Sequence, residues 1–498
     1  MDPKINIPRQ IMFFRHICTL LFKNVEEAMG KKLARDLTNL IGVVFTSDMW
    51  TSRSNQGYLS LTIHYIDPDW VMQRFPIDCR MVVGRHDSEV LGRYLNSMIG
   101  AIKNLRDSTA TIMVTDAEAK MKNADKISKH LLCVDHAINN ALKYAMQIEE
   151  VGDLVKLFRA LATGVKRSSV RNDLMRKKAA DLEVQKSFLY SSLHQDRSVQ
   201  QDPLVFNVHD HHIVRNKAVL LSLKDDVFNT PSDFAALIPN KLQFQDLKDI
   251  LWPLEQIKEV SKRLQADETP TLQHVVPDMA KIAMMSASRI KLFADFTDAT
   301  KAFIKKFQEE IKIRVPELGR NVDLYQMAHY LKPTQKAVYP GTRSHGHLFY
   351  ECEQSIKLHL ANLAPAAPRS IQMPEPACQD LEGFLREHYD LDLDPELAFG
   401  SVDQSQSQPA PVPYYVKEMN QWMESPLEKE DIDVIQYWKM KAKKLPLLAK
   451  VAQMVYAIPA TSASSERVFS EAGLVTKPTR SLLNNERVQE LVYIHDNY

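Results

Sequence analysis

Three acidic residues that lie far apart in the sequence could together bind a divalent metal ion. Asp48 follows the apolar run 41–45, and Asp116 follows the apolar run 111–114. If these runs form adjacent strands, both carboxylates reach one edge of a sheet, and Glu466, on a helix packed against that sheet, is the candidate for a third ligand. Carboxylate oxygens suit Mg²⁺ or Mn²⁺, and two such ions can activate water for phosphodiester cleavage.

Spacing alone does not single out these three residues. The chain has 62 acidic residues, and an acidic residue at a strand end more often belongs to a solvated turn. Flanking motifs therefore have to decide between a catalytic and a purely structural interpretation.

The elements that would position the carboxylates form an α/β pattern. Apolar alternation predicts strands at 58–66 and 75–83, the first with a solvated face carrying Ser60, Thr62 and His64. Asp87-Ser88 is typical of a helix start, and short apolar runs predict further strands at 111–114 and 131–134, with a helix at 136–147. Three strands followed by alternating helices and strands predict a ribonuclease H-like layer.

Composition excludes several other classes of protein. Only 14 glycines in 498 residues disfavour an all-β fold, and the net charge of +1 restricts any nucleic-acid surface to a local patch. The five cysteines are widely spread, so neither a disulfide framework nor a zinc site is expected. Without a signal peptide or an apolar stretch of membrane-spanning length, we expect an intracellular protein with no membrane partner and no small-molecule substrate.

Four motifs in the same order resemble those of the hobo–Activator (hAT) transposase family. The strongest is IPATSASSERVFSEAGLVTKPTRSLL at 458–483, which resembles the C-terminal family signature. TSDMWTS at 46–52 and VTDAEAKMKNA at 114–124 resemble the two aspartate motifs, and CVDHAINNAL at 133–142 is similar to the Cys-x-x-His segment.

The resemblance implies a fold class and roles for individual residues. The fold would be α/β plus α, a ribonuclease H-like core split by a large all-helical insertion, with a C-terminal helical dimerisation region. Asp48, Asp116 and Glu466 would be the catalytic metal ligands. Cys133 and His136 would position DNA, although a buried strand residue is the favoured interpretation for Cys133, and this pair is too small for a zinc site.

Departures from the family pattern favour a domesticated copy. Ala117 follows the second aspartate where the family usually has Asn, and Lys332 stands where a later motif has Asp. The Cys/His array of a BED-type zinc finger is not found in the sequence. We therefore expect a DNA-binding, self-associating regulator of transcription, and its nuclear location is inferred from the resemblance alone. An active transposase and a protein-interaction scaffold remain alternatives.

DNA contact would require a local basic surface. The basic stretch on the predicted helices near 150–180 supplies the candidates, Lys166, Arg167, Arg171, Arg176, Lys177 and Lys178. A solvated helix face explains the same residues equally well. Trp252 is a candidate for the family's insert tryptophan but more often such a residue is in a core, and the histidine-rich segment 209–212 is more typical of an exposed loop than of a metal site.

The chain is expected to have five segments. They are an N-terminal helical segment 1–40, the first part of the core 41–150, the helical insertion 151–361, a partly disordered linker 362–430 and the dimerisation region 431–498. Apolar residues of the last segment would be buried against this chain or a partner chain; they are Trp438, Leu448, Val451, Val455, Leu491 and Val492.

Overall fold

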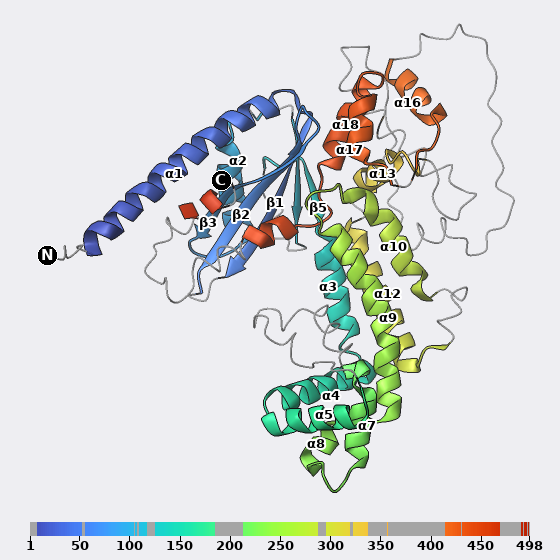
Figure 1. Ribbon diagram of the computed structural model, residues 1–498. Coiled ribbons are helices and arrows are strands. Elements are labelled where there is room, and N and C mark those ends of the chain that lie inside the picture. Colours follow the sequence, from blue (N-terminus) through green and yellow to red (C-terminus); the bar gives the residue numbers. More distant parts are fainter. Residues whose placement is uncertain are drawn as a thin grey trace, which may run out of the picture. The chain divides into compact units, whose positions relative to one another are not determined.

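The chain folds into two compact units that are each continuous in space but not in sequence. The first comprises Met1–Val134, Leu264–Val276 and Glu317–Tyr498, and the second comprises Asp135–Arg263 and Pro277–Pro316. The computed structural model (Figure 1) describes residues 7–51, 55–103, 105–106, 109–116, 125–184, 213–286, 295–318, 322–336, 356, 414–429, 431–468, 490–491, 493–495 and 497.

A five-stranded mixed sheet with the order β3-β2-β1-β4-β5 lies at the centre of the first unit. Strands β1 (Gly42–Thr51), β2 (Gly57–Ile66) and β3 (Met72–Val82) form an antiparallel meander. Strands β4 (Ala110–Thr115) and β5 (Lys129–Leu132) extend it in parallel from β1. The five expected strands are therefore confirmed, and β1 is longer than expected because its second half pairs with the start of β2.

One face of the sheet is covered by helices close to it in the sequence. These are α1 (Ile7–Asp36), the short η1 (Leu37–Asn39) and α2 (Ser88–Gly100). The side chain of Asp87 accepts a hydrogen bond from the Val90 amide, which confirms the expected helix start. The core between these layers contains Leu33, Leu37, Phe45, Leu61, Ile63, Leu91, Leu95 and Met98.

The opposite face of the sheet is also buried, and the expectation of a solvated face on β2 was wrong. Ser60, Thr62 and His64 are each at most 7% exposed. Segments from the C-terminal part of the chain cover them, namely α18 (Pro446–Tyr456) and a helical turn at 463–468. The covering segment brings the Ser464 hydroxyl to His64 of β2 and the Ser465 hydroxyl to Thr46 of the neighbouring β1.

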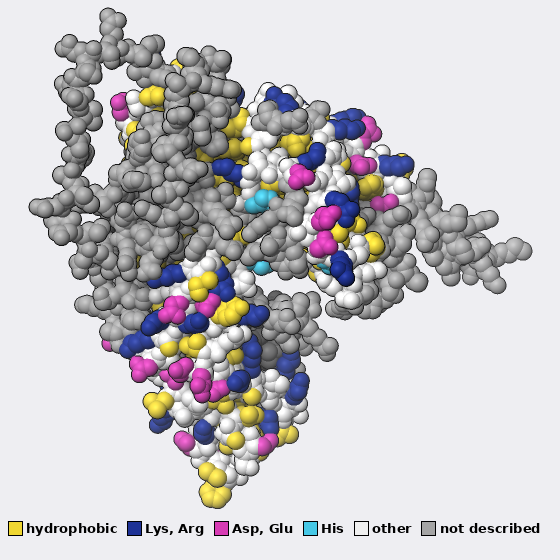
Figure 2. All heavy atoms as spheres, turned by 180° about the vertical axis from the view of Figure 1, so that it is seen from behind, with side chains coloured by type: hydrophobic (Ala, Val, Ile, Leu, Met, Phe, Trp, Pro, Cys, Tyr) yellow, Lys and Arg dark blue, Asp and Glu magenta, His cyan; other side chains and the backbone are white. Residues whose placement is uncertain are grey.

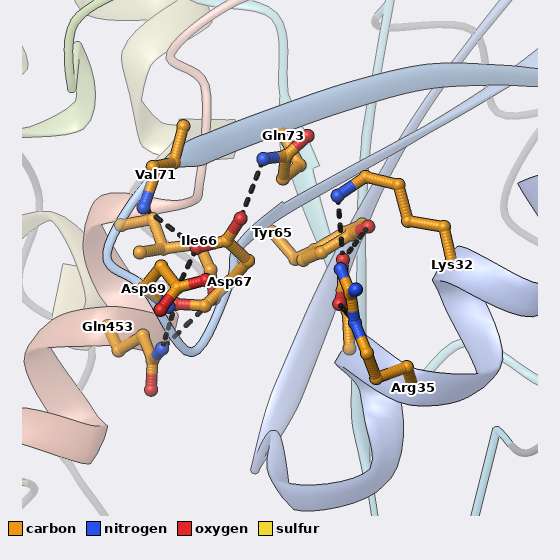
Figure 3. Close-up of polar contacts among 10 residues, drawn as sticks. Lys32, Arg35, Tyr65, Ile66, Asp67, Asp69, Val71, Gln73 and Gln453 are labelled. Atoms are coloured by element: carbon orange, nitrogen blue, oxygen red, sulfur yellow. Dashed lines mark hydrogen bonds and ion pairs between the residues drawn. The ribbon is translucent and has the colours of Figure 1, made fainter.

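A buried carboxylate joins the end of α1 to the sheet (Figure 3). Asp36 is 1% exposed, and it accepts hydrogen bonds from Lys32, Arg35 and the Tyr65 hydroxyl. Burial raises the pKa of Asp36, but these three donors outweigh it and hold the pKa below its usual value. The carboxylate therefore stays charged and fixes the first helix against β2.

The turn between β2 and β3 is held by a second buried carboxylate. Asp67 accepts hydrogen bonds from the amides of Asp69 and Val71 and from the Gln73 side chain. On α18, Gln453 donates to the carbonyls of Ile66 and Asp67 (Figure 3). The C-terminal helix is thus bonded to the backbone of the central sheet.

Three further helices of the first unit pack around aromatic residues. They are α13 (Val322–Tyr330), α16 (Tyr414–Glu424) and α17 (Val434–Lys441). Trp422 lies 4.8 Å from Trp438, whose indole N–H donates to the Leu331 carbonyl. The buried carboxylate of Glu418 accepts from the amides of Leu447 and Leu448, which caps the N-terminus of α18.

In the second unit, all regular elements among the described residues are helical. They are α3 (Val134–Ala145), α4 (Glu149–Lys166), α5 (Ser169–Asp181), α7 (Lys217–Asp225), α8 (Ser232–Leu237), α9 (Lys241–Leu264), α10 (Val275–Ala283), η6 (Met284–Ser286) and α12 (Asp298–Leu318), some of which begin or end in the first unit. The 3-10 turn η5 (Leu272–His274) belongs to the first unit. None of the described helices is long and apolar enough to cross a membrane.

Candidate functional site

Asp48 lies on β1, and Asp116 directly follows the neighbouring parallel strand β4. In the β1–β4 register Thr46 pairs with Val114, and each aspartate follows its member of that pair by two residues. Side chains two residues apart on a strand share a face, so this register, continued by two residues, would bring both carboxylates to the same face, on strands about 4.8 Å apart. Both residues are half-buried. The paired residues end two positions before both aspartates, so the convergence expected from the sequence stays a prediction.

The helical turn that carries Glu466 is fixed over the same face of β1. The Ser465 hydroxyl donates to Oγ1 of Thr46 at 2.8 Å, and Thr46 precedes Asp48 by two residues. The Ser464 hydroxyl lies 3.3 Å from Nε2 of His64, and Thr46 Oγ1 lies 3.0 Å from the same nitrogen. These contacts place the turn next to the strand end that bears Asp48.

His64 is the part of this arrangement that the sequence did not reveal. Burial, with a smaller contribution from the positive charge of Arg74, lowers the pKa of His64 to about 3. The imidazole is therefore neutral and links the strand hydroxyl to the C-terminal serines. The only sequence signal was the pair of serines before Glu466, which a solvated helix start would explain as well.

Cys133 holds the C-terminal segment rather than facing solvent. It directly follows β5, is 1% exposed, and its Sγ accepts a hydrogen bond from the Ser462 amide at 3.3 Å. The next amide, of Val134, donates to the Ala460 carbonyl. This agrees with the buried interpretation favoured for Cys133, and it gives the residue a structural role in positioning the segment that leads to Glu466.

His136 lies in the first turn of α3 and is half-buried. Its neighbour Asp135 is buried and accepts hydrogen bonds from Ser261 on α9 and from Asn139. The start of α3 is therefore tied to α9 through Asp135. The DNA-positioning role expected for His136 stays a prediction.

The described side chains stop short of a complete metal centre. No group of three His, Cys, Asp or Glu side chains in the described ranges lies close enough to hold a metal ion. Strands β1 and β4 are paired up to two residues before Asp48 and Asp116, and the turn of Glu466 is bonded to Thr46 of β1. All three residues supply the hard oxygen atoms that Mg²⁺ and Mn²⁺ prefer. The donor chemistry thus fits the ion, whereas assembly of the three ligands stays a prediction.

Two of the six basic candidates on α4 and α5 are used inside the helical unit. Arg171 donates to Asp233 and lies over the Phe234 ring, and Lys178 pairs with Asp226 at 3.0 Å. Both pairs connect α5 to neighbouring elements, as a structural role requires.

The other four basic candidates, Lys166, Arg167, Arg176 and Lys177, are exposed. Arg176 lies 3.6 Å from Asp173. On the face of the helical unit seen in Figure 2, basic and acidic side chains are interspersed rather than separated by sign. Four of the six candidates are therefore exposed and remain candidates for a DNA contact.

Two candidates of the helical unit remain, the residue Trp252 and the histidine-rich segment 209–212. The ring of Trp252 lies 5.5 Å from that of Phe296, which is the packing role that is more common for such a residue. The histidine-rich segment 209–212 lies outside the described residues.

Most of the residues expected at a dimer surface lie in the core of this chain. Trp438, Leu448, Val451 and Val455 are each 0% exposed in the single chain. They are therefore not available to a partner, because α17 and α18 use their apolar faces against the first unit itself. Leu491 is half-buried, and Val492 lies outside the described residues.

Comparison with known proteins agrees with both parts of this arrangement. Residues 415–498 match the model of the hAT family C-terminal dimerisation region, and residues 46–142 match the model of the ZBED1 RNase-like domain. These matches support a hAT transposase-derived protein. The two matches contain all three acidic candidates and the strands that position them.

Curated relatives of this chain are distant, and the matches extend over half or more of it. It is 22% identical to the Putative AC transposase of Zea mays over 100% of this chain and 61% of the relative. It is 21% identical to Zinc finger BED domain-containing protein RICESLEEPER 2 of Oryza sativa subsp. japonica, over 91% of this chain and 64% of that protein. Zinc finger protein 618 of Homo sapiens is 24% identical over 52% of this chain and 24% of its own length. The chain thus spans about three fifths of the first two relatives.

Proposed function

We propose that this chain is a domesticated hAT transposase that binds DNA, self-associates and acts in the nucleus as a regulator of transcription. We further infer that it still binds Mg²⁺ or Mn²⁺ through Asp48, Asp116 and Glu466, and that the helical unit is an insertion into the ribonuclease H-like core. The observation that supports the metal site is the β1–β4 register, which pairs Thr46 with Val114, two residues before Asp48 and Asp116 respectively. Ala117 and Lys332, which depart from the family motifs, support domestication.

Metal binding is the first test of this proposal. Asp48→Ala should weaken Mn²⁺ binding by roughly tenfold or more, because it removes a direct oxygen ligand, and even outer-shell changes at metal sites cost about tenfold. Isothermal titration calorimetry of the two proteins measures the difference. Asp69→Ala is the matched control, since Asp69 is an exposed carboxylate in the turn at the other end of the sheet. Equal Mn²⁺ affinities for the native protein and Asp48→Ala would refute the site.

DNA binding should depend on the exposed basic residues of the helical unit. For the double variant Arg167→Ala, Lys177→Ala, we expect the slope of log affinity against log salt to become shallower by about 0.9 for each phosphate that the protein no longer neutralises. Fluorescence anisotropy with a duplex at several salt concentrations measures the slope, and Lys31→Ala on α1 is the control. If the native chain shows no salt-dependent binding, the scaffold function replaces this proposal.

Self-association is supported by the match to a dimerisation region. Because Leu491 is half-buried in the single chain, it is the one described candidate from the sequence that a partner could still cover. Leu491→Asp should lower the mass measured by sedimentation equilibrium, since a charge resists burial at an interface. An unchanged mass would show that Leu491 is not at the interface. Met440→Asp, at a 68% exposed position on α17, controls for added charge.

An active transposase is the second candidate function. It is favoured by the presence of Asp48 and Asp116, each two residues after the paired Thr46 and Val114, together with a fixed turn carrying Glu466. Cleavage of labelled transposon-end DNA in Mn²⁺ by the native chain, and loss of cleavage in Asp116→Asn, would establish it. Metal binding without cleavage favours the domesticated regulator.

A further inference from the structure

The arginine next to Glu466 makes contacts outside the sheet. Arg467 donates one hydrogen bond to the carboxylate of Asp267 and another to the Gln265 carbonyl at 2.7 Å. Asp267 also accepts a hydrogen bond from Arg74 on β3, at 2.6 Å. The three charged side chains of Arg74, Asp267 and Arg467, which we call the Asp267 clamp, all belong to the first unit.

Asp267 belongs to the connection 265–271, which also bonds to the segment that leads to Glu466. Gln265 and Asp267 directly follow α9, and a few residues later Thr271 accepts a hydrogen bond from the amide of Ala460 at 2.8 Å. The connection 265–271 is thus bonded both before and after the start of the helical turn at 463–468. It acts as a brace along the segment that carries the candidate ligand.

These contacts matter because the helical turn at 463–468 is too short to be stable, or to keep a fixed orientation, without tertiary contacts. The described part of this helix is 463–468, and helices shorter than about 12 residues are marginal without tertiary contacts. On one side, Ser464 and Ser465 bond to the buried pair of Thr46 and His64. On the other side the turn is held by Arg467, so Glu466 lies in sequence between two points of attachment.

Because its side chains are partly exposed, we expect the Asp267 clamp to fix the orientation of the turn rather than to add much to the free energy of folding. Side chains of Arg74, Asp267 and Arg467 are 39%, 28% and 45% exposed. Ion pairs at such positions add little to the free energy of folding. They do restrict the orientation of the turn, and a carboxylate must be placed within about 0.5 Å to act as a ligand.

We propose that Asp267 is a positioning residue for the metal centre: through Arg467 it orients the turn carrying Glu466 and so sets the affinity for a divalent cation. This rests on the proposed metal-binding function. It assigns to residues 265–267, which lie far in sequence from all three carboxylates, a part in building the site.

A double-mutant cycle on the full chain tests the proposal, with Mn²⁺ alone as the probe. Asp267→Asn should raise the Kd for Mn²⁺ about tenfold, the usual cost of removing an outer-shell partner. The conservative variant Asp267→Glu should restore most of the affinity. In the Glu466→Gln background, Asp267→Asn should change the Kd little, because the ligand that it positions is already gone. Circular dichroism melting of each variant reports the fold, and Asp233→Asn, at the arginine pair of α8, is the control.

The results of this cycle distinguish failure of the proposed metal centre from failure of the proposed role of Asp267. No Mn²⁺ binding by the native chain overturns the metal centre and the clamp with it. Native binding that Asp267→Asn leaves unchanged overturns the clamp alone. An equal loss of affinity in the native and Glu466→Gln backgrounds also overturns it, since the effect would then not pass through Glu466. If Asp267→Asn fails to fold, Arg467→Lys replaces it in the same cycle, because lysine keeps the charge but does not have the two-donor geometry.

Discussion

Leu448→Ala should lower the free energy of unfolding by about 2–5 kcal/mol, the usual cost of truncating a fully buried leucine. Leu448 is 0% exposed on α18, and its amide donates to the buried carboxylate of Glu418. The cavity would open inside a single chain, so the loss should be the same at low and high protein concentration. Denaturant unfolding at two concentrations measures it.

This result distinguishes a core residue from an interface residue. A residue buried only by a partner would cost little in the monomer and would make apparent stability depend on concentration. Met440→Ala is the control, because Met440 is 68% exposed near the end of the preceding helix and its truncation should change stability by less than about 0.5 kcal/mol. A small loss in Leu448→Ala together with a lower sedimentation mass would contradict the core assignment.

Acidification should destabilise the first unit through His64 by several kcal/mol. Its pKa in the folded chain is about 3 against an ordinary value of 6.5, so below pH 6.5 the unfolded chain binds a proton that the folded chain does not. Stability is fully present above pH 6.5 and is lost as the pH falls toward 3, by up to about 1.4 kcal/mol per pH unit. Urea unfolding between pH 7 and pH 4 measures this slope.

The variant His64→Gln isolates the contribution of the imidazole. Glutamine keeps a polar group near Thr46 and Ser464 but does not titrate, so its stability should fall less steeply with acid than that of the native chain. Ser464→Ala is the control: it removes one hydroxyl of the same cluster, and it should lower stability by a similar amount at each pH. Parallel slopes for the native chain and His64→Gln would show that His64 accepts a proton without unfolding the cluster.

Local features of the first unit could be predicted because they depend on neighbouring residues. Alternation of apolar side chains located the five strands, and Asp87 before an apolar helical stripe located the start of α2. The apolar runs before the two aspartates pair in parallel, up to Thr46 and Val114. The sequence therefore predicted the two strands that lead to the aspartates, whereas a shared site of their carboxylates stays a prediction.

Burial and pairing across the chain could not be predicted in this way. An apolar stripe such as that of Leu448, Val451 and Val455 has the same pattern whether it meets its own chain or a partner. In the same way, nothing near Arg171 in sequence shows that Asp233 neutralises it.

The sequence by itself determined which acidic residues are the candidate ligands. It showed that two of them follow predicted strands and that the third lies in the C-terminal motif. Only the tertiary structure decided that the polar face of β2 is dry, that Cys133 and His64 hold the C-terminal segment, and that Asp267 reaches Arg467. The physical reason is that periodicity records which way a side chain points, whereas burial and ion pairing depend on segments hundreds of residues away.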